Sequence, residues 1–178
     1  GMSDYKRILS LDSAMAVVQF KKDHVAYQRN YFISYPANVM VMRFSADQPG
    51  KQNLVFSYAP NPVSTGNMAS DSNKGLVYSA SLDNNGMKYV VRIQAETKGG
   101  TLSNADGKLT VKGADEGVFY ITADTDYKPN FDPDFKEPKT YVGVNPEETT
   151  KEWMNNAVSQ GYTALFSQHY NDYAALFN

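Results

Sequence analysis

The sequence predicts a mainly β protein, an antiparallel β-sandwich followed by two C-terminal helices. Over most of the first two thirds of the 178 residues, apolar side chains alternate with polar ones, a period of two that places neighbouring residues on opposite faces of a strand. Clusters of Asn, Asp and Gly separate these runs at short intervals, which favours antiparallel strands over βαβ units. Near the end, apolar residues recur every three or four positions, as in amphipathic helices.

The strands follow from the alternating runs. The clearest run places Met87, Tyr89 and Val91 on one face and Lys88 and Arg92 on the other. Residues 39–44 are largely apolar on both faces, which is expected of a strand that is central or covered on both sides. In chain order, we predict strands at residues 15–20, 25–35, 39–44, 54–58, 76–82, 87–95, 100–102, 109–111 and 118–123.

The connections between the strands differ in length. Residues 22–24, 83–86 and 105–108 carry the Asn, Asp and Gly that tolerate a positive φ angle, so each predicts a tight turn. Residues 60–74 are rich in Ser, Asn, Pro and Gly and predict a long surface loop. Residues 124–144 predict a second long connection, a proline-interrupted crossing with scattered aromatic residues.

The helical end of the chain begins with clear signals. Asn145 is a suitable N-cap, Pro146 suits the first helical position, and Glu147 adds negative charge to the first turn. Gly161 is expected to end this helix, and a second one is predicted over residues 162–177. We therefore divide the chain into a sandwich region, residues 1–144, and a helical segment, residues 145–178, within one structural domain. The second helix is still apolar where the sequence stops, so we expect further chain beyond it.

Composition excludes several function classes. There are 17 basic and 19 acidic residues, so no net field attracts nucleic acid or anionic membranes. No run of eighteen apolar residues exists, and the start of the sequence has no signal peptide. The absence of cysteine excludes a thiol nucleophile, an iron–sulfur cluster, a cysteine-based zinc site and disulfides. We expect no nucleic-acid or membrane partner.

No catalytic set is recognisable. His24 is expected to be an exposed turn residue and His169 a packed, hydrogen-bonded side chain on the apolar face of the last helix. Asp124 and Asp126, Asp132 and Asp134, and Glu147 and Glu148 are interpreted as loop or cap carboxylates. A calcium site in residues 124–134 is the weaker alternative, because the regular spacing of a calcium loop is missing. We predict no catalytic residue, no metal and no cofactor.

The aromatic residues offer one candidate site. The chain has 13 Tyr, 9 Phe and 1 Trp, and most of them fall on the apolar side of a strand or helix, where core packing is expected. Trp153 lies on such a helical stripe and is expected to be buried. Four aromatic residues of the long crossing are not explained by periodicity, and we regard them as candidate carbohydrate contacts: Tyr127, Phe131, Phe135 and Tyr141.

Several motifs together resemble a known family. Residues 5–14 read YKRILSLDSA, residues 27–36 read YQRNYFISYP, and an apolar strand ends at Arg43. Gly113-Ala114-Asp115-Glu116, residues 123–127 and the segment from Gly161 to Phe177 follow in the same order. This series resembles the N-terminal, supersandwich-like β-sandwich region of glycoside hydrolase family 95, the α-L-fucosidase type, over nearly the whole chain.

The resemblance implies a piece of a longer enzyme. Members carry more sandwich upstream and a catalytic (α/α)6 barrel downstream that supplies the acid and the base, so no family catalytic residue falls on this chain. It also implies a periplasmic or extracellular location for the parent protein.

We consider three hypotheses. The leading one is a non-catalytic N-terminal domain that packs on the barrel through the final helix and shapes the cleft with loops such as residues 60–74. The alternative is a free-standing carbohydrate-binding module for fucosylated glycans, and the third is that this chain is itself a hydrolase. If sandwich strands are missing, unpaired sheet edges would also allow copies of the chain to pair.

Overall fold

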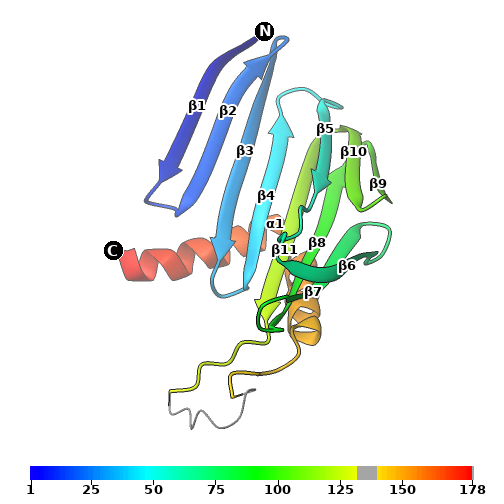
Figure 1. The fold of residues 1–178 in the computed structure, drawn as a ribbon. Coiled ribbons are helices and arrows are strands. Elements are labelled where there is room, and N and C mark those ends of the chain that lie inside the picture. Colours follow the sequence, from blue (N-terminus) through cyan, green and yellow to red (C-terminus); the bar gives the residue numbers. More distant parts are fainter. Residues whose placement is uncertain (132–139, 178) are drawn as a thin grey trace.

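The fold consists of two antiparallel sheets and one helical element (Figure 1). The computed structural model describes residues 1–131 and 140–177. The larger sheet has eight strands in the order β1-β2-β3-β4-β11-β8-β7-β6, and the smaller has the order β5-β10-β9. The prediction of a mainly β antiparallel sandwich is confirmed. The strands are β1 (Met2–Ser10), β2 (Met15–Lys22), β3 (Val25–Ser34), β4 (Val39–Ala46), β5 (Gln52–Ser57), β6 (Ser64–Ser70), β7 (Gly75–Leu82), β8 (Lys88–Lys98), β9 (Thr101–Ala105), β10 (Lys108–Ala114) and β11 (Glu116–Thr125).

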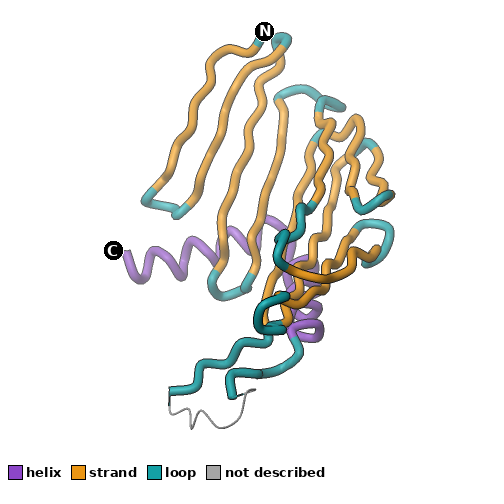
Figure 2. Tube along the Cα trace, viewed as in Figure 1, coloured by secondary structure: helices purple, strands orange, loops and turns teal. Residues whose placement is uncertain are grey.

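Two layers cover opposite faces of the large sheet. The small sheet packs on one face over β4, β11, β8 and β7, and helix α1 (Pro146–Phe177) crosses the other face (Figure 2). The core under the small sheet is built from one set of buried side chains: Leu76, Ile93, Ala95, Leu109, Val111, Ala114 and Phe119. The core under the helix is built from another: Phe32, Val39, Val41, Val118, Tyr120, Met154, Ala157 and Leu165.

The central strands are covered on both sides, as residues 39–44 predicted. Val39 and Val41 of β4 belong to the core under the helix, whereas Met42 and Phe44 pack against the core under the small sheet. Burial of each such side chain contributes about 1.5–3 kcal/mol relative to an exposed one. The layers on both faces therefore hold the middle of the sheet most firmly.

The predicted tight turns have the backbone that their residues allow. Asp23 and His24 have φ angles of 52° and 64°, and Asp106 and Gly107 have φ angles of 51° and 68°. Two successive positive φ angles are typical of the turns that join antiparallel strands. His24 is exposed in its turn, as predicted.

Two strands differ from the sequence predictions. The predicted surface loop of residues 60–74 contains β6, which pairs with β7 from Ser64↔Leu82 to Ser70↔Leu76. The prediction was wrong because β6 is an exposed edge strand with no apolar alternation, held by backbone hydrogen bonds. β1 was not predicted either, and nearly all of its residues are exposed. It also carries a bulge between Ser3 and Lys6, where Asp4 has a φ angle of 53°.

The helical segment begins as predicted, and Gly161 interrupts it at the predicted position. The Asn145 side chain accepts a hydrogen bond from the Glu147 amide at 3.2 Å, as an N-cap does. Gly161 has φ 72° and ψ 172°, a conformation almost restricted to glycine. A helix resumes immediately after this break, as predicted for residues 162–177, so α1 consists of two helical stretches joined at Gly161 without a loop. Trp153 is only partly buried.

A buried ion pair fixes the start of α1 on the sheet. The Arg92 side chain of β8, which is 8% exposed, lies 2.7 Å from both Asp71 and Glu147. Its Nε donates to Thr150 Oγ1 at 3.2 Å. Ser79 of β7 also hydrogen-bonds Glu147. Glu147 is therefore a structural carboxylate of the first helical turn, as the sequence predicted.

No helix in residues 1–131 and 140–177 is long and apolar enough to cross a membrane.

We predict that Arg92→Met lowers the free energy of unfolding by about 2–3 kcal/mol. The substitution leaves two acidic side chains, each about a third exposed or more, without their cation. The matched control is Lys21→Met, because Lys21 pairs with Asp4 at 3.0 Å on the surface, and an exposed pair contributes less than about 1 kcal/mol. Urea denaturation of both variants measures the difference, and equal effects would contradict a structural role for the Arg92 cluster.

Candidate functional site

Two surfaces of the molecule are candidates for function: the crossing that carries the predicted carbohydrate contacts, and an apolar groove at the end of α1. A polar groove lies near the top of β1 to β4.

The structure brings together two of the four predicted carbohydrate contacts. The rings of Tyr127 and Tyr141 stack with centroids 6.0 Å apart and planes 12° from parallel. They are 53% and 38% exposed, so their outer faces remain open. Phe131 is 96% exposed and makes no ring stack with either tyrosine. Phe135 lies outside the described residues.

Backbone hydrogen bonds hold the two tyrosines in register. The Lys128 amide donates to the Tyr141 carbonyl at 2.7 Å, and the Gly143 amide donates to the Asp126 carbonyl at 2.6 Å. Asp126 is itself buried, and its carboxylate accepts a hydrogen bond from the Lys88 amide at 2.9 Å. The base of the crossing is thus tied to the first residue of β8, and Asp126 has a structural role.

A pocket of about 510 Å³ lies beside the point where β11 runs into the crossing. Its walls include Tyr58, Tyr89 and Met87, and its polar groups include Asn61 and Asp124. Burial raises the pKa of Tyr58 above its ordinary value, so this hydroxyl stays protonated. Aromatic walls with a few polar groups are typical of small-molecule sites.

The apolar groove lies between the end of α1 and the lower end of β3. It has a volume of about 610 Å³ and is lined mainly by apolar side chains, among them Leu9, Ile33, Tyr35 and Leu176. These four are 69%, 68%, 82% and 86% exposed, respectively. Exposed patches of large apolar side chains are typical of interaction sites in soluble proteins.

His169 forms the floor of this groove and is packed and hydrogen-bonded, as predicted. Its ring stacks on Phe32 with centroids 4.9 Å apart, and it is 6% exposed. Nε2 lies 3.1 Å from the Ser13 carbonyl and 3.2 Å from the Ala14 carbonyl. Because carbonyl oxygens only accept, Nε2 carries a proton. The histidine therefore ties α1 to the turn between β1 and β2.

A chain of polar contacts links the sheet to the middle of α1. The Gln28 amide donates to Asn30 at 2.9 Å, and Asn30 donates to the Tyr162 hydroxyl at 3.2 Å. Arg43 lies over the Tyr162 ring at 4.8 Å and pairs with Glu116 at 2.5 Å. These contacts orient Tyr162 just beyond the kink at Gly161.

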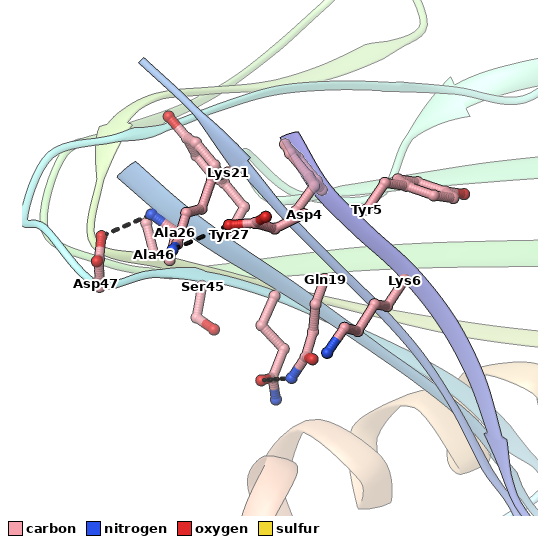
Figure 3. Close-up of a pocket in the computed structure, with 12 residues that line it drawn as sticks. Asp4, Tyr5, Lys6, Gln19, Lys21, Ala26, Tyr27, Ser45, Ala46 and Asp47 are labelled. Carbon is pink, nitrogen blue, oxygen red and sulfur yellow. Dashed lines mark hydrogen bonds and ion pairs between the residues drawn. The ribbon is translucent and has the colours of Figure 1, made fainter. Parts of the chain in front are cut away.

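The polar groove has a volume of about 590 Å³ and lies on the helix side of the upper strands (Figure 3). Lys6 and Gln19 point toward the side on which the helix lies, whereas Tyr5 does not. Gln19 donates to Gln28 at 3.0 Å, and the Asp47 carboxylate accepts a hydrogen bond from the Ala26 amide at 2.9 Å. The polar groups of this groove mostly pair with one another, so it offers no arrangement typical of catalysis.

The described residues offer no metal site or acid–base pair. Residues 1–131 and 140–177 contain no group of three or more His, Asp or Glu side chains that could hold a metal ion. Asp124 accepts a hydrogen bond from the amide of Thr125. Asp132 and Asp134, and with them the calcium alternative for residues 124–134, lie outside the described residues. Sequence reasoning missed the apolar groove, because its walls come from β1, β3 and α1, far apart in the chain.

Comparisons with known proteins agree on the kind of domain. A family model described as "Glycosyl hydrolase family 65, N-terminal domain" matches residues 1–130. The probable alpha-fucosidase A of Aspergillus niger is 31% identical over 98% of this chain and 22% of its own length. Alpha-L-fucosidase 2 of Arabidopsis thaliana is 25% identical over 99% of this chain and 23% of its own length. The resemblance to fucosidase-type N-terminal regions is confirmed by these relatives.

A solved structure has the same fold. It is titled "Putative kojibiose phosphorylase from human microbiome" and superposes with a TM-score of 0.61 at 10% identity, over 97% of this chain and 25% of that one. The chain thus spans about a quarter of the length of the proteins it matches.

We predict that His169→Ala lowers the free energy of unfolding by about 1–3 kcal/mol, because it removes a buried hydrogen bond and leaves the Ser13 carbonyl without that donor. His169→Gln keeps an N–H donor and should recover part of the loss. Gln168→Ala, at an exposed position of the same helix, is the control and should change stability by less than about 0.5 kcal/mol. Thermal unfolding measures all three variants. Equal stability of His169→Ala and the control would contradict the structural assignment.

Proposed function

The chain belongs to the family of glycosyl hydrolase N-terminal domains that its residues 1–130 match, and we propose that it is the non-catalytic N-terminal domain of a fucosidase-type glycoside hydrolase. In this proposal it packs on the catalytic domain of the parent protein through the apolar groove at the end of α1. The segment of residues 60–74, with the edge strand β6, would lie toward the substrate cleft.

The apolar groove is the observation that supports docking most directly. Leu176 on α1 and Ile33 on β3 are each more than two-thirds exposed on opposite sides of it. Burial of one such side chain contributes about 1.5–3 kcal/mol, so a partner that covered several of them would be held firmly. The relatives are about four times as long as this chain and therefore contain chain that could cover it.

The placement of the acidic residues supports a non-catalytic role. One carboxylate near the crossing and one at the helix start are engaged in structural contacts: Asp126 accepts a backbone hydrogen bond, and Glu147 pairs with Arg92. Glycoside hydrolysis requires two carboxyl groups that face a common bond about 5–10 Å apart. Carboxylates that already form structural contacts are poor candidates for the catalytic acid or base.

Ile33→Thr tests the docking. In the isolated chain, Ile33 is 68% exposed, so the substitution should change stability by less than about 0.5 kcal/mol. If docking buries Ile33 in the full-length parent protein, the same substitution should lower the free energy of unfolding by about 1–3 kcal/mol. Val55→Thr is the control, because Val55 is 66% exposed on the small sheet, away from α1. Thermal unfolding in both contexts gives the comparison.

A loss in the parent protein no larger than that of the control would argue against docking through this groove. An aryl fucoside assay of the isolated chain addresses the catalytic question separately. We expect no turnover, and hydrolysis that disappears when one carboxylate is substituted would refute the non-catalytic assignment.

The stacked pair Tyr127 and Tyr141 favours glycan binding as a second candidate function. Their open outer faces suit the flat face of a sugar ring, and the pocket beside the crossing is large enough for one. NMR titration of the chain with a fucosylated trisaccharide should then shift amides of residues 124–131 and 140–143. Tyr127→Ala should abolish these shifts, whereas Tyr5→Ala, at a 53% exposed tyrosine of β1 on the far edge of the large sheet, should not. An absence of shifts at millimolar sugar would contradict this candidate.

A further inference from the structure

The small sheet stops before the large sheet does. Within residues 1–131 and 140–177, β5 pairs with β10 on one side and with no strand on the other. The large sheet continues past it as β3, β2 and β1, and Figure 1 shows no element in front of these three strands. The outer edge of β5 therefore carries free backbone N–H and C=O groups beside an uncovered sheet face. Such an edge is a template for another strand.

The uncovered face carries aromatic side chains in register. Phe20 of β2 and Tyr27 of β3 are cross-strand partners, and their rings stack 5.1 Å apart with planes 13° from parallel. The Arg29 guanidinium lies over Phe20, 5.1 Å from its centroid. These side chains line a groove of about 650 Å³ that runs from β1 across to the first residues of β5. The floor of the groove is thus already ordered and partly apolar.

The groove is cationic. Its lining includes Arg7, Lys22, Arg29 and Lys51, and no Asp or Glu of residues 1–131 or 140–177 lines it. None of these four forms an ion pair within the described residues. Arg7 and Arg29 both face Val18, from the strands on either side of it, so their charges reinforce each other. A chain of net charge −2 therefore carries a local positive surface here, which attracts acidic groups.

One buried donor in the groove has no partner. Gln52, the first residue of β5, is 3% exposed and lines the groove. Its Nε2 makes no hydrogen bond among the described residues. A buried amide donor without an acceptor is unfavourable. Because Nε2 is closed to solvent in this structure, an occupant would supply the acceptor only after the Gln52 side chain turns toward the groove.

We propose that an extended segment of a partner polypeptide adds to the free edge of β5 and lies over β1, β2 and β3. Its backbone pairs with β5, and its inward side chains are apolar residues that contact Phe20 and Tyr27 and acidic residues that pair with Arg7 and Arg29. The regular spacing of free N–H and C=O groups along β5 matches a polypeptide strand. A second copy of this chain is a poor occupant, because a two-fold contact would bring the same cationic groups face to face.

The test is an NMR titration of the full 178-residue chain with two capped peptides. One has two Asp-Thr-Val-Thr repeats, which place Asp and Val alternately on one face of a strand, and the other has two Lys-Thr-Val-Thr repeats. The acidic peptide should shift the amides of residues 52–57, Arg7 and Arg29 and bind more tightly than the basic one. Each of these charge pairs that is lost should weaken binding about 1.5- to 5-fold.

A matched pair of variants distinguishes binding in the groove from general electrostatic attraction between the chain and the acidic peptide. Arg7→Gln should weaken the binding of the acidic peptide by the factor expected for one lost charge pair, whereas Lys6→Gln should leave its binding unchanged. Lys6 is the neighbouring exposed residue of β1 and faces the opposite side of the sheet. Both positions are exposed, so both variants should retain the wild-type pattern of amide shifts.

Several results would overturn the proposal. These are equal binding of the two peptides, shifts at the β1 or β6 edge in place of β5, equal effects of the two variants, or no shift at millimolar peptide. Light scattering measures whether the chain alone forms a dimer. A dimer of the chain alone that protects the amides of β5 would identify a second copy as the occupant and would also refute the proposal.

Discussion

The burial of β4 and β11 on both faces is the constraint on which the rest of the structure depends. Val41 and Tyr120 pack beneath α1, while Phe44 and Phe119 pack beneath the small sheet. Burial also raises the pKa of Tyr120, so its hydroxyl stays protonated and donates to Glu96 at 3.0 Å. Because both covering layers are centred on these strands, β1 to β3 lack a cover on one side. The uncovered face of β1 to β3 therefore results from the limited extent of the layers that cover the large sheet.

Three polar anchors along α1 determine how the helix lies on the sheet. The Arg92 cluster fixes its start, the contact from Asn30 to Tyr162 fixes its middle beyond the kink, and His169 fixes its last turns to the β1–β2 turn. Apolar packing alone is non-directional, whereas these contacts specify position. The apolar groove at the helix end thus has a defined shape, as a docking surface for a second domain requires.

The sequence predicted the strands in which apolar and polar side chains alternate. It missed the strands that are held mainly by backbone hydrogen bonds. The strand at residues 39–44 was recognised because both faces are apolar, and β6 was missed because Gly66 and Asn67 carry no such signal. Gly161 was recognised as a helix breaker, and the apolar periodicity of residues 162–177 predicted the helix that follows it. Tyr127 and Tyr141 were singled out by elimination, and only backbone pairing brings them together. The apolar groove and the free β5 edge depend on tertiary arrangement and have no local signature.

The bulge in β1 interrupts the outer edge of the large sheet. Between Ser3 and Lys6 the register slips by one residue, and Asp4 at its positive φ angle pairs with Lys21 on the surface. An interrupted, charged edge is a poor template for uncontrolled stacking of sheets. The polar residues of β6 give the opposite edge a similar character. Both borders of the large sheet are therefore poor templates for strand pairing, whereas the free edge of β5 carries no such irregularity.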